Sequence, residues 1–141
     1  MIFKTLTGSE KRVTRAKKYL IDWSAKSKSN IQFEAKQFLQ KYWSNHIVFE
    51  EFPVAGSRLN FDFYNANKKV AVEIHGKQHD QYTPFFHKRR AGFISHIRRD
   101  QQKRDFCELN DIILVEIYAN KTGAIKHELN KKTFANLGVY L

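Results

Sequence analysis

The pattern of apolar residues between positions 46 and 75 most constrains what this chain can fold into. The segments 46–52, 59–64 and 69–75 are short and rich in apolar residues, and in the last two these alternate with other residues, as is typical of strands. The turns between them contain Pro53-Val-Ala-Gly56 and Asn65-Ala-Asn67. Because such short connections favour antiparallel neighbours, the sequence predicts three successive strands in one sheet.

Helices are expected before and after these three strands in the sequence. Val13, Ala16, Leu20 and Trp23 recur at helical spacing and predict a helix over 9–23. Polar residues 27–30 suit an N-cap for a second helix over 31–43. A long helix over 87–110, a mostly apolar strand over 112–118 in the sheet interior and a helix over 123–132 complete the chain. This order predicts an α/β sandwich with a mixed sheet.

Composition limits the classes of function. The chain has 141 residues, 42% of them hydrophobic and 14% aromatic, which fits a single folded domain, 1–141. Lys and Arg number 25 against 14 acids, a net charge of +11, so a nucleic acid or a membrane surface is a more natural partner than a small acidic substrate. The apolar run 112–115 is too short to span a bilayer, and the first residues lack a signal-peptide core. A single Cys107 excludes an internal disulfide. We expect an intracellular, cytoplasmic protein without membrane contact.

Asp62 and Glu73 are the first candidate site residues. Each lies on a predicted strand, eleven positions apart. Two carboxylates at neighbouring strand ends suit a hard divalent cation, which takes oxygen ligands. They share one face only in a suitable strand register, and register is not visible in the sequence. The alternative is that Asp62 simply faces solvent on the polar side of a half-buried strand.

Two histidines follow around a glycine, in Glu73-Ile-His-Gly-Lys-Gln-His79. Imidazole exchanges protons near neutral pH, so His75 or His79 could deprotonate water or protonate a leaving oxygen. A zinc site of both histidines and a carboxylate competes with this interpretation. Magnesium is favoured over zinc because carboxylates with phosphate as co-ligand suit it better.

The helices add two carboxylates and a basic run. Asp100 and Glu34 lie at helical spacing beside apolar residues, which predicts that both lean inward. A buried carboxylate needs a partner, and for Asp100 a structural ion pair with Arg99, Lys103 or Arg104 is the alternative. Residues Tyr82, Phe85 and Phe86 could stack on bases or cap the core. The basic residues predicted to contact DNA are Lys77, Lys88, Arg89, Arg90, Arg98, Arg99, Lys103 and Arg104.

Together these motifs resemble the PD-(D/E)XK nuclease superfamily. The similarity is greatest to the branch with very-short-patch-repair endonucleases and phage-type homing nucleases that carry a Glu, Asp, His, Asp constellation. It covers about 29–118 of this chain, with 30–118 as the catalytic core and 1–29 as a basic N-terminal helical extension. The resemblance implies a three-layer, restriction-endonuclease-like sandwich in which a central mixed sheet is flanked by helices.

The resemblance also implies roles for individual residues. Asp62 matches the central metal-binding carboxylate and Glu73 the second acidic position. His79 matches the histidine after the glycine turn, while Asp100 and, less closely, Glu34 match the helix acids. His75 stands where the superfamily pattern has lysine, so the positive charge of that lysine would come from the metal, Lys77 or Lys103. With Cys107 alone, the chain cannot build the cysteine-rich zinc site of very-short-patch-repair members, which argues against mismatch repair.

The expected function is therefore a Mg²⁺-dependent DNA endonuclease, with Mn²⁺ as a possible substitute, encoded by a phage in a bacterial host. Phosphate contacts hold a duplex without reading its sequence, so specificity would need a homodimer or an accessory protein. One alternative is a catalytically silent nucleic-acid-binding module. Others are a structure-specific resolvase or an RNA-directed nuclease of the same fold.

Overall fold

A four-stranded mixed sheet forms the centre of the computed structural model, which describes residues 1–76, 90–118 and 127–141. β3 (Val48–Pro53) pairs antiparallel with β4 (Asn60–Asn65), and β4 pairs antiparallel with β5 (Val70–His75). β5 and β6 (Ile113–Tyr118) run parallel. The prediction of antiparallel neighbours in a mixed sheet is confirmed. The order of the strands across the sheet is the same as their order in the chain, from β3 to β6.

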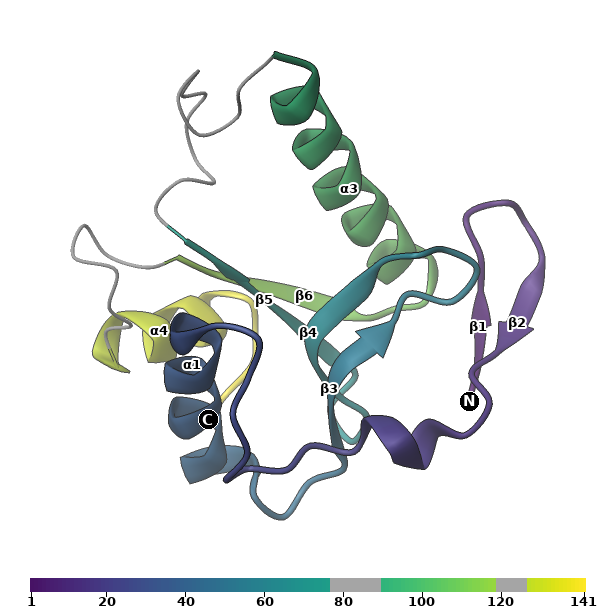
Figure 1. Cartoon of the computed structure of the whole chain (residues 1–141). Coiled ribbons are helices and arrows are strands. Elements are labelled where there is room, and N and C mark those ends of the chain that lie inside the picture. The colour runs from purple at the N-terminus through teal and green to yellow at the C-terminus, as the bar shows by residue number, and fades with distance from the viewer. Residues whose placement is uncertain (77–89, 119–126) are drawn as a thin grey trace.

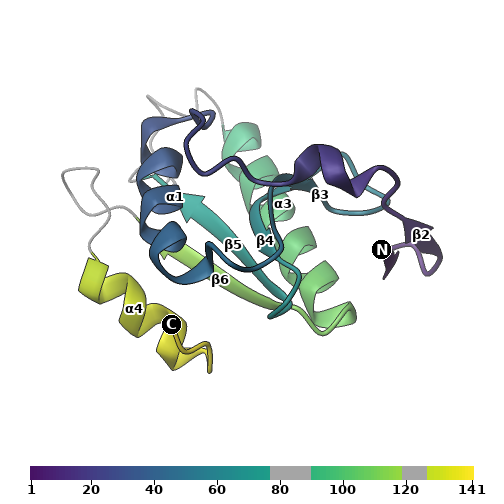
Figure 2. The ribbon, with the colours of Figure 1, turned by 90° about the horizontal axis from the view of Figure 1, so that it is seen from below.

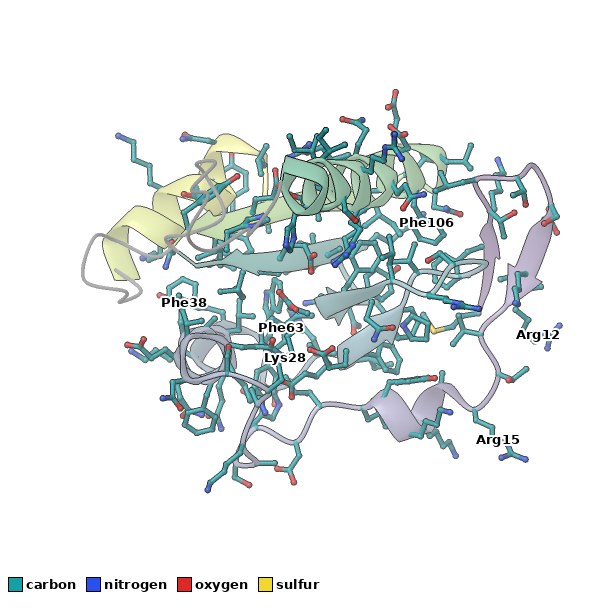
Figure 3. All side chains as sticks on the ribbon, turned by 45° about the horizontal axis from the view of Figure 1, so that its top comes forward. Arg12, Arg15, Lys28, Phe38, Phe63 and Phe106 are labelled. Carbon is teal, nitrogen blue, oxygen red and sulfur yellow. The ribbon has the colours of Figure 1, made fainter. Side chains whose placement is uncertain are left out.

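Helices cover both faces of this sheet. On one face, α1 (Asn30–Trp43) and α4 (His127–Asn136) lie side by side (Figures 1 and 2). The other face is covered by α3 (Arg90–Leu109), and Figure 3 shows α3 and α1 on opposite sides of the strands. Because the parallel pair β5 and β6 requires a long crossover, α3 is placed between them in the chain. The α/β class with helices flanking a mixed sheet is therefore observed.

The alternation in β5 divides the core into two clusters. Val70 and Val72 pack with Leu39 of α1, whereas Ala71 packs with Phe106 of α3. Glu73 and His75 continue the series that begins with Ala71, so they belong to the α3 side of the strand. The apolar part of the sheet thus carries the core, and the polar residues come where the strand ends.

The first thirty residues differ from the prediction of a helix over 9–23. They form a hairpin of β1 (Ile2–Lys4) and β2 (Glu10–Arg12), followed by the 3-10 helix η1 (Ala16–Tyr19). Val13 is buried and η1 packs against β3. Val13, Ala16 and Trp23 therefore take part in tertiary packing without forming one face of a helix, and Leu20 is exposed. The prediction of a helix over 9–23 is wrong.

Two further features differ from expectation. The sequence predicts β6 in the sheet interior, but this strand lies at an edge of the sheet that the described residues form, with Ile113 and Tyr118 exposed. α4 ends four residues later than the predicted helix over 123–132, and residues 123–126 of that prediction lie outside the described ranges. In these described ranges, no helix is both long and apolar enough to cross a membrane.

Candidate active site between α1 and α3

The register of β4 and β5 brings Asp62 and Glu73 together. Phe63 pairs with Val72, so the next residues in this register are Asp62 and Glu73. They do not continue the backbone ladder. Instead, the backbone N–H of Asp62 donates to Oε2 of Glu73 at 2.8 Å, and the N–H of Ile74 donates to Oδ2 of Asp62 at 2.8 Å. Each carboxylate is thereby oriented by the neighbouring strand, and its other oxygen remains available for a cation.

These two carboxylates line a cavity of about 370 Å³ at the end of the sheet. Both are nearly buried, Asp62 being 7% and Glu73 5% exposed. Its walls come from the start of α1, the strands β4 and β5, and α3. The lining residues are Lys28, Ser29, Ile31, Gln32, Asp62, Glu73, Ile74, His75, Gly76, His96, Arg99, Asp100 and Lys103.

Two lysines neutralise the acidic pair. Lys28 Nζ lies 3.1 Å from Asp62 Oδ1 and 3.4 Å from Glu51 Oε1, and Figure 3 shows Lys28 beside α1. Lys103, from α3, donates to Oε1 of Glu73. The ammonium groups therefore contact the oxygens that the backbone amides leave free. The space beside these two carboxylate oxygens is therefore electrostatically favourable for a positive charge.

The proximity of two buried acids changes the pKa of Glu73. Burial and the charge of Asp62 raise this pKa to about 7, against the opposing effect of Lys103. A second negative charge is costly beside the first. A divalent cation would relieve that cost, because it compensates both carboxylates at once.

His75 is held in a fixed orientation on the α3 side of the site. Its Nε2 lies 3.1 Å from Oε1 of Glu116, and its ring stacks on Tyr118 with centroids 4.7 Å apart. Arg104 donates to the same Glu116 oxygen at 3.1 Å. Burial lowers the pKa of His75, but the hydrogen bond to Glu116 and the charges of Asp100 and Glu116 outweigh it, and the net pKa is raised.

Asp100 lines the cavity, as its place beside the apolar stripe of the helix predicts. It is half-buried. The ion pairs among the described residues do not include one between Asp100 and Arg99, Lys103 or Arg104. The pKa values of His75 and Arg104 are raised mainly by their hydrogen bonds to Glu116, and the charge of Asp100 adds to this effect.

Glu34 does not lean inward, and that prediction is wrong. It is exposed and does not line the cavity. The buried residues of α1 are Gln32, Ala35, Lys36, Phe38, Leu39 and Trp43, so Glu34 falls outside the covered stripe. In place of the expected helix carboxylate, α1 presents the amide of Gln32 and the ammonium group of Lys36.

A polar network behind the cavity is not indicated by the sequence motifs. Gln32 Nε2 donates to Glu50 Oε2 at 2.9 Å and to Glu51 Oε1 at 3.0 Å. Lys36, which is 0% exposed, lies 2.7 Å from Glu50. Two successive residues of a strand normally face opposite sides, but Glu51 has a φ of 52° and breaks this alternation. The adjacent acids Glu50-Glu51 are the signal that could have indicated the network.

Several predicted site residues lie outside the described ranges. These include His79, the favoured general base, so the zinc alternative with both histidines is left open. Arg98 is exposed on α3, and Arg99 and Lys103 line the cavity. The other predicted residues outside the described ranges are Lys77, Lys88, Arg89, the side chain of Arg90, and the aromatic residues Tyr82, Phe85 and Phe86.

The donor chemistry of the site fits a hard cation. In the described part of the chain, no three His, Cys, Asp or Glu side chains are grouped closely enough to form a complete metal cage. Asp62 and Glu73 nevertheless supply two oriented carboxylates beside an open cavity. Mg²⁺ is commonly held by one or two carboxylates, with waters and substrate phosphates as its other ligands.

Comparison with known proteins finds viral relatives that match part of the chain. The chain is 34% identical over 65 residues to the uncharacterized protein 033L of Invertebrate iridescent virus 3, covering 46% of this chain and 34% of that protein. It is 37% identical over 59 residues to the uncharacterized protein 307L of Invertebrate iridescent virus 6, covering 42% and 30%. The uncharacterized protein 094L of Frog virus 3 is 36% identical over 66 residues, covering 46% and 43%.

The chain therefore spans less than half the length of these relatives. No family model matches the sequence, and no solved structure matches the fold. The relatives are viral proteins whose names state no activity. The expectation of a phage origin stays a prediction.

Proposed function

We propose that this chain is a Mg²⁺-dependent DNA endonuclease with a restriction-endonuclease-like sandwich of the PD-(D/E)XK superfamily. The observation that carries the proposal is the reciprocal bonding of Asp62 and Glu73. Each accepts a hydrogen bond from the backbone beside the other, and each turns its second oxygen to a cation. A half-buried strand does not need such an arrangement for stability.

The order of elements supports the finer fold. A helix, three antiparallel strands, a helix on the other face and a parallel fourth strand form the mixed sheet and its flanking layers. The acidic pair lies next to the point where the pairing of the two central strands, β4 and β5, ends, between the flanking helices. The mixed sheet with helices on both faces is the layout that the resemblance implies for the superfamily, whereas the resemblance implies a site at one edge of the sheet and Asp62 and Glu73 lie on its two inner strands.

Asp62 and Glu73 would hold the magnesium ion. When bound, the ion would polarise the scissile phosphate and lower the pKa of the attacking water. Lys28, Arg99 and Lys103 line the same cavity and would contact the phosphate oxygens. Lys103 carries the permanent positive charge that the superfamily pattern places at the position of His75.

Histidine would perform the proton transfer. Glu116 and Tyr118 orient the ring of His75, so this residue can hold or pass a proton at the cavity wall. His79 is the other candidate. Asp100 would position His75 or a water through its charge, in place of the role expected for Glu34.

The proposal is tested with Asp62→Asn, which keeps the side-chain shape and removes the charge. Metal-dependent cleavage should fall by a factor of ~100 or more, as expected when a group that stabilises transition-state charge is removed, while DNA binding in EDTA persists. Glu34→Gln is the matched control and should cleave like the wild type, because Glu34 lies outside the cavity. Cleavage by Asp62→Asn at the wild-type rate would contradict the metal assignment.

The substrate panel contains plasmid, linear duplex, branched DNA, single-stranded DNA and RNA, each with and without Mg²⁺. Preference for branched DNA or RNA would favour the resolvase or RNA-directed alternative. One observation supports a catalytically silent module: Lys28 and Lys103 already neutralise both acids without a metal. That candidate predicts no cleavage of any substrate and reduced folding stability in Asp62→Asn.

A further inference from the structure

A second cationic surface lies on the N-terminal hairpin, apart from the candidate active site. It consists of Lys11, Arg12, Arg15, Lys17 and Lys18, and is called here the hairpin basic surface. All five residues are exposed. None takes part in the ion pairs found among the described residues. Figure 3 shows the side chains of Arg12 and Arg15 extending outward at the end of the molecule away from Phe38.

The hairpin that carries this surface is anchored to the core. Phe3 is buried and contacts the rings of Phe52, Tyr64 and Phe106, with centroids 5.7–6.2 Å apart. The backbone of Lys4 exchanges two hydrogen bonds with the Asn110 side chain, at 2.8 and 2.9 Å. The cations are therefore presented by a fixed scaffold.

The β3–β4 turn also packs against the hairpin. A Cβ atom at Gly56 would approach Thr5 Cγ2 to 2.7 Å, so this glycine permits close contact. Beside the turn lies a groove of about 190 Å³, lined by Lys11, Arg12 and Lys18 on one side and by Gly56 and Ser57 on the other. Positive charge thus borders a shallow groove.

Clustered cations on a rigid scaffold repel one another, and a bound polyanion removes that cost. The shape favours a nucleic-acid backbone over a membrane. Interfacial membrane binding uses an amphipathic helix with a long apolar face, whereas the cations here come from β2, a turn at Arg15 and a single 3-10 turn. Spaced cations beside a groove match the repeated phosphates of a duplex.

We propose that the hairpin basic surface binds the phosphate backbone of duplex DNA at a distance from the cleaved bond. The inference rests on the proposed function for the choice of DNA as the polyanion. Because the surface lies outside the cavity, it adds affinity and orientation without entering the chemistry. Such contacts are independent of base sequence.

The test compares two triple variants of equal net charge. Lys11→Gln/Arg12→Gln/Arg15→Gln alters the hairpin basic surface. Lys41→Gln/Lys68→Gln/Lys132→Gln removes three exposed lysines elsewhere. Fluorescence anisotropy with a short labelled duplex in EDTA measures affinity over a range of salt concentrations. The plot of log affinity against log salt should become shallower by roughly 0.9 for each phosphate that the protein no longer neutralises, hence by up to about 2.7 in the hairpin variant.

The control variant should keep a slope close to that of the wild type. Equal reductions of the slope in both triple variants would overturn the inference, because they would show a general effect of net charge. Weaker binding of the hairpin variant to phosphatidylserine vesicles, with unchanged duplex binding, would also overturn it and assign the surface to membranes. Circular dichroism verifies that both variants are folded.

Failure of this inference and failure of the proposed function are separable. The binding assay in EDTA contains no divalent cation and does not depend on cleavage. A shallower slope in the hairpin variant, together with no cleavage by the wild type or any variant, would refute the nuclease and retain the DNA surface. An unchanged slope in the hairpin variant, together with Asp62-dependent cleavage, would refute the DNA surface and retain the nuclease.

Discussion

At the scale of single residues, the acidic pair is the most unusual feature of the molecule. Buried carboxylates are normally paired, and here each has both a backbone amide and a lysine. The pair is stable only because these four groups converge on it. Its electrostatics make the free energy of unfolding sensitive to pH.

Glu73 provides the first prediction at this scale. Its pKa is about 7 in the folded protein against an ordinary value of 4.5, so the folded state binds the proton more tightly. Stability from this group is present below pH 4.5 and declines as the pH rises to about 7. A pKa difference of one corresponds to about 1.4 kcal/mol, so protonated Glu73 contributes at most roughly 3 kcal/mol to the free energy of unfolding.

Urea unfolding without divalent cations measures this dependence. Between about pH 5 and 7 the free energy of unfolding should fall, and the raised pKa of His75 acts in the same direction as the pH passes its ordinary value of 6.5. Glu73→Gln should make the dependence weaker, while Glu34→Gln should leave it unchanged. Identical pH profiles for Glu73→Gln and the wild type would contradict the raised pKa.

At the scale of elements, the network between α1 and β3 connects the N-terminal segment to the site. Lys36 is buried under it and donates to the carbonyl oxygens of Asp22 and Ala25 at 3.1 and 2.8 Å, besides its contact with Glu50. One ammonium group thus joins three segments. Its removal leaves a partly buried carboxylate and two carbonyl groups without their cation.

Lys36→Met should therefore destabilise the protein by about 3–5 kcal/mol, the usual cost of removing one partner of a buried pair. The double variant Lys36→Met/Glu50→Gln should recover part of this stability, because the uncompensated charge is removed as well. Lys41→Met, an exposed position on the same helix, serves as the control and should change stability by no more than ~0.5 kcal/mol. Denaturant unfolding measures all three, and equal destabilisation by Lys36→Met and Lys41→Met would contradict the network.

At the scale of the whole molecule, the proposed metal site couples cation binding to folding. The two carboxylates come from β4 and β5 and meet only in the folded sheet, so Mg²⁺ should bind the folded state alone. A Mg²⁺ concentration about 100-fold above the dissociation constant would stabilise it by about 2.7 kcal/mol.

Thermal unfolding with MgCl₂, compared with KCl at equal ionic strength, tests this coupling without any measurement of activity. The midpoint should rise by several degrees in the wild type and in Glu34→Gln. The same rise in Asp62→Asn would show that Mg²⁺ acts elsewhere on the protein.

Local pattern was sufficient for most elements of the fold. The period of the apolar residues predicted α1, β4 and β5, since burial of one face requires that spacing, and a short apolar segment followed by a turn predicted β3. It failed over 9–23, where Val13 and Ala16 pack against one core cluster, Trp23 packs against the other and Leu20 is exposed. It also failed for the place of β6, because an apolar strand at an edge of the sheet can be covered by helices.

For the candidate site as well, some features could be predicted from the sequence and others required the tertiary structure. Residue types and spacing along the chain determined that Asp62, Glu73, His75 and Asp100 were the groups to consider, because the chemistry of a side chain is local. Only the tertiary structure decided that Asp62 and Glu73 meet, that Lys28 and Lys103 neutralise them, and that Glu34 lies outside. Strand register and helix rotation arise from packing between residues that are distant in the chain. A local sequence pattern does not show which of these distant residues will pack together.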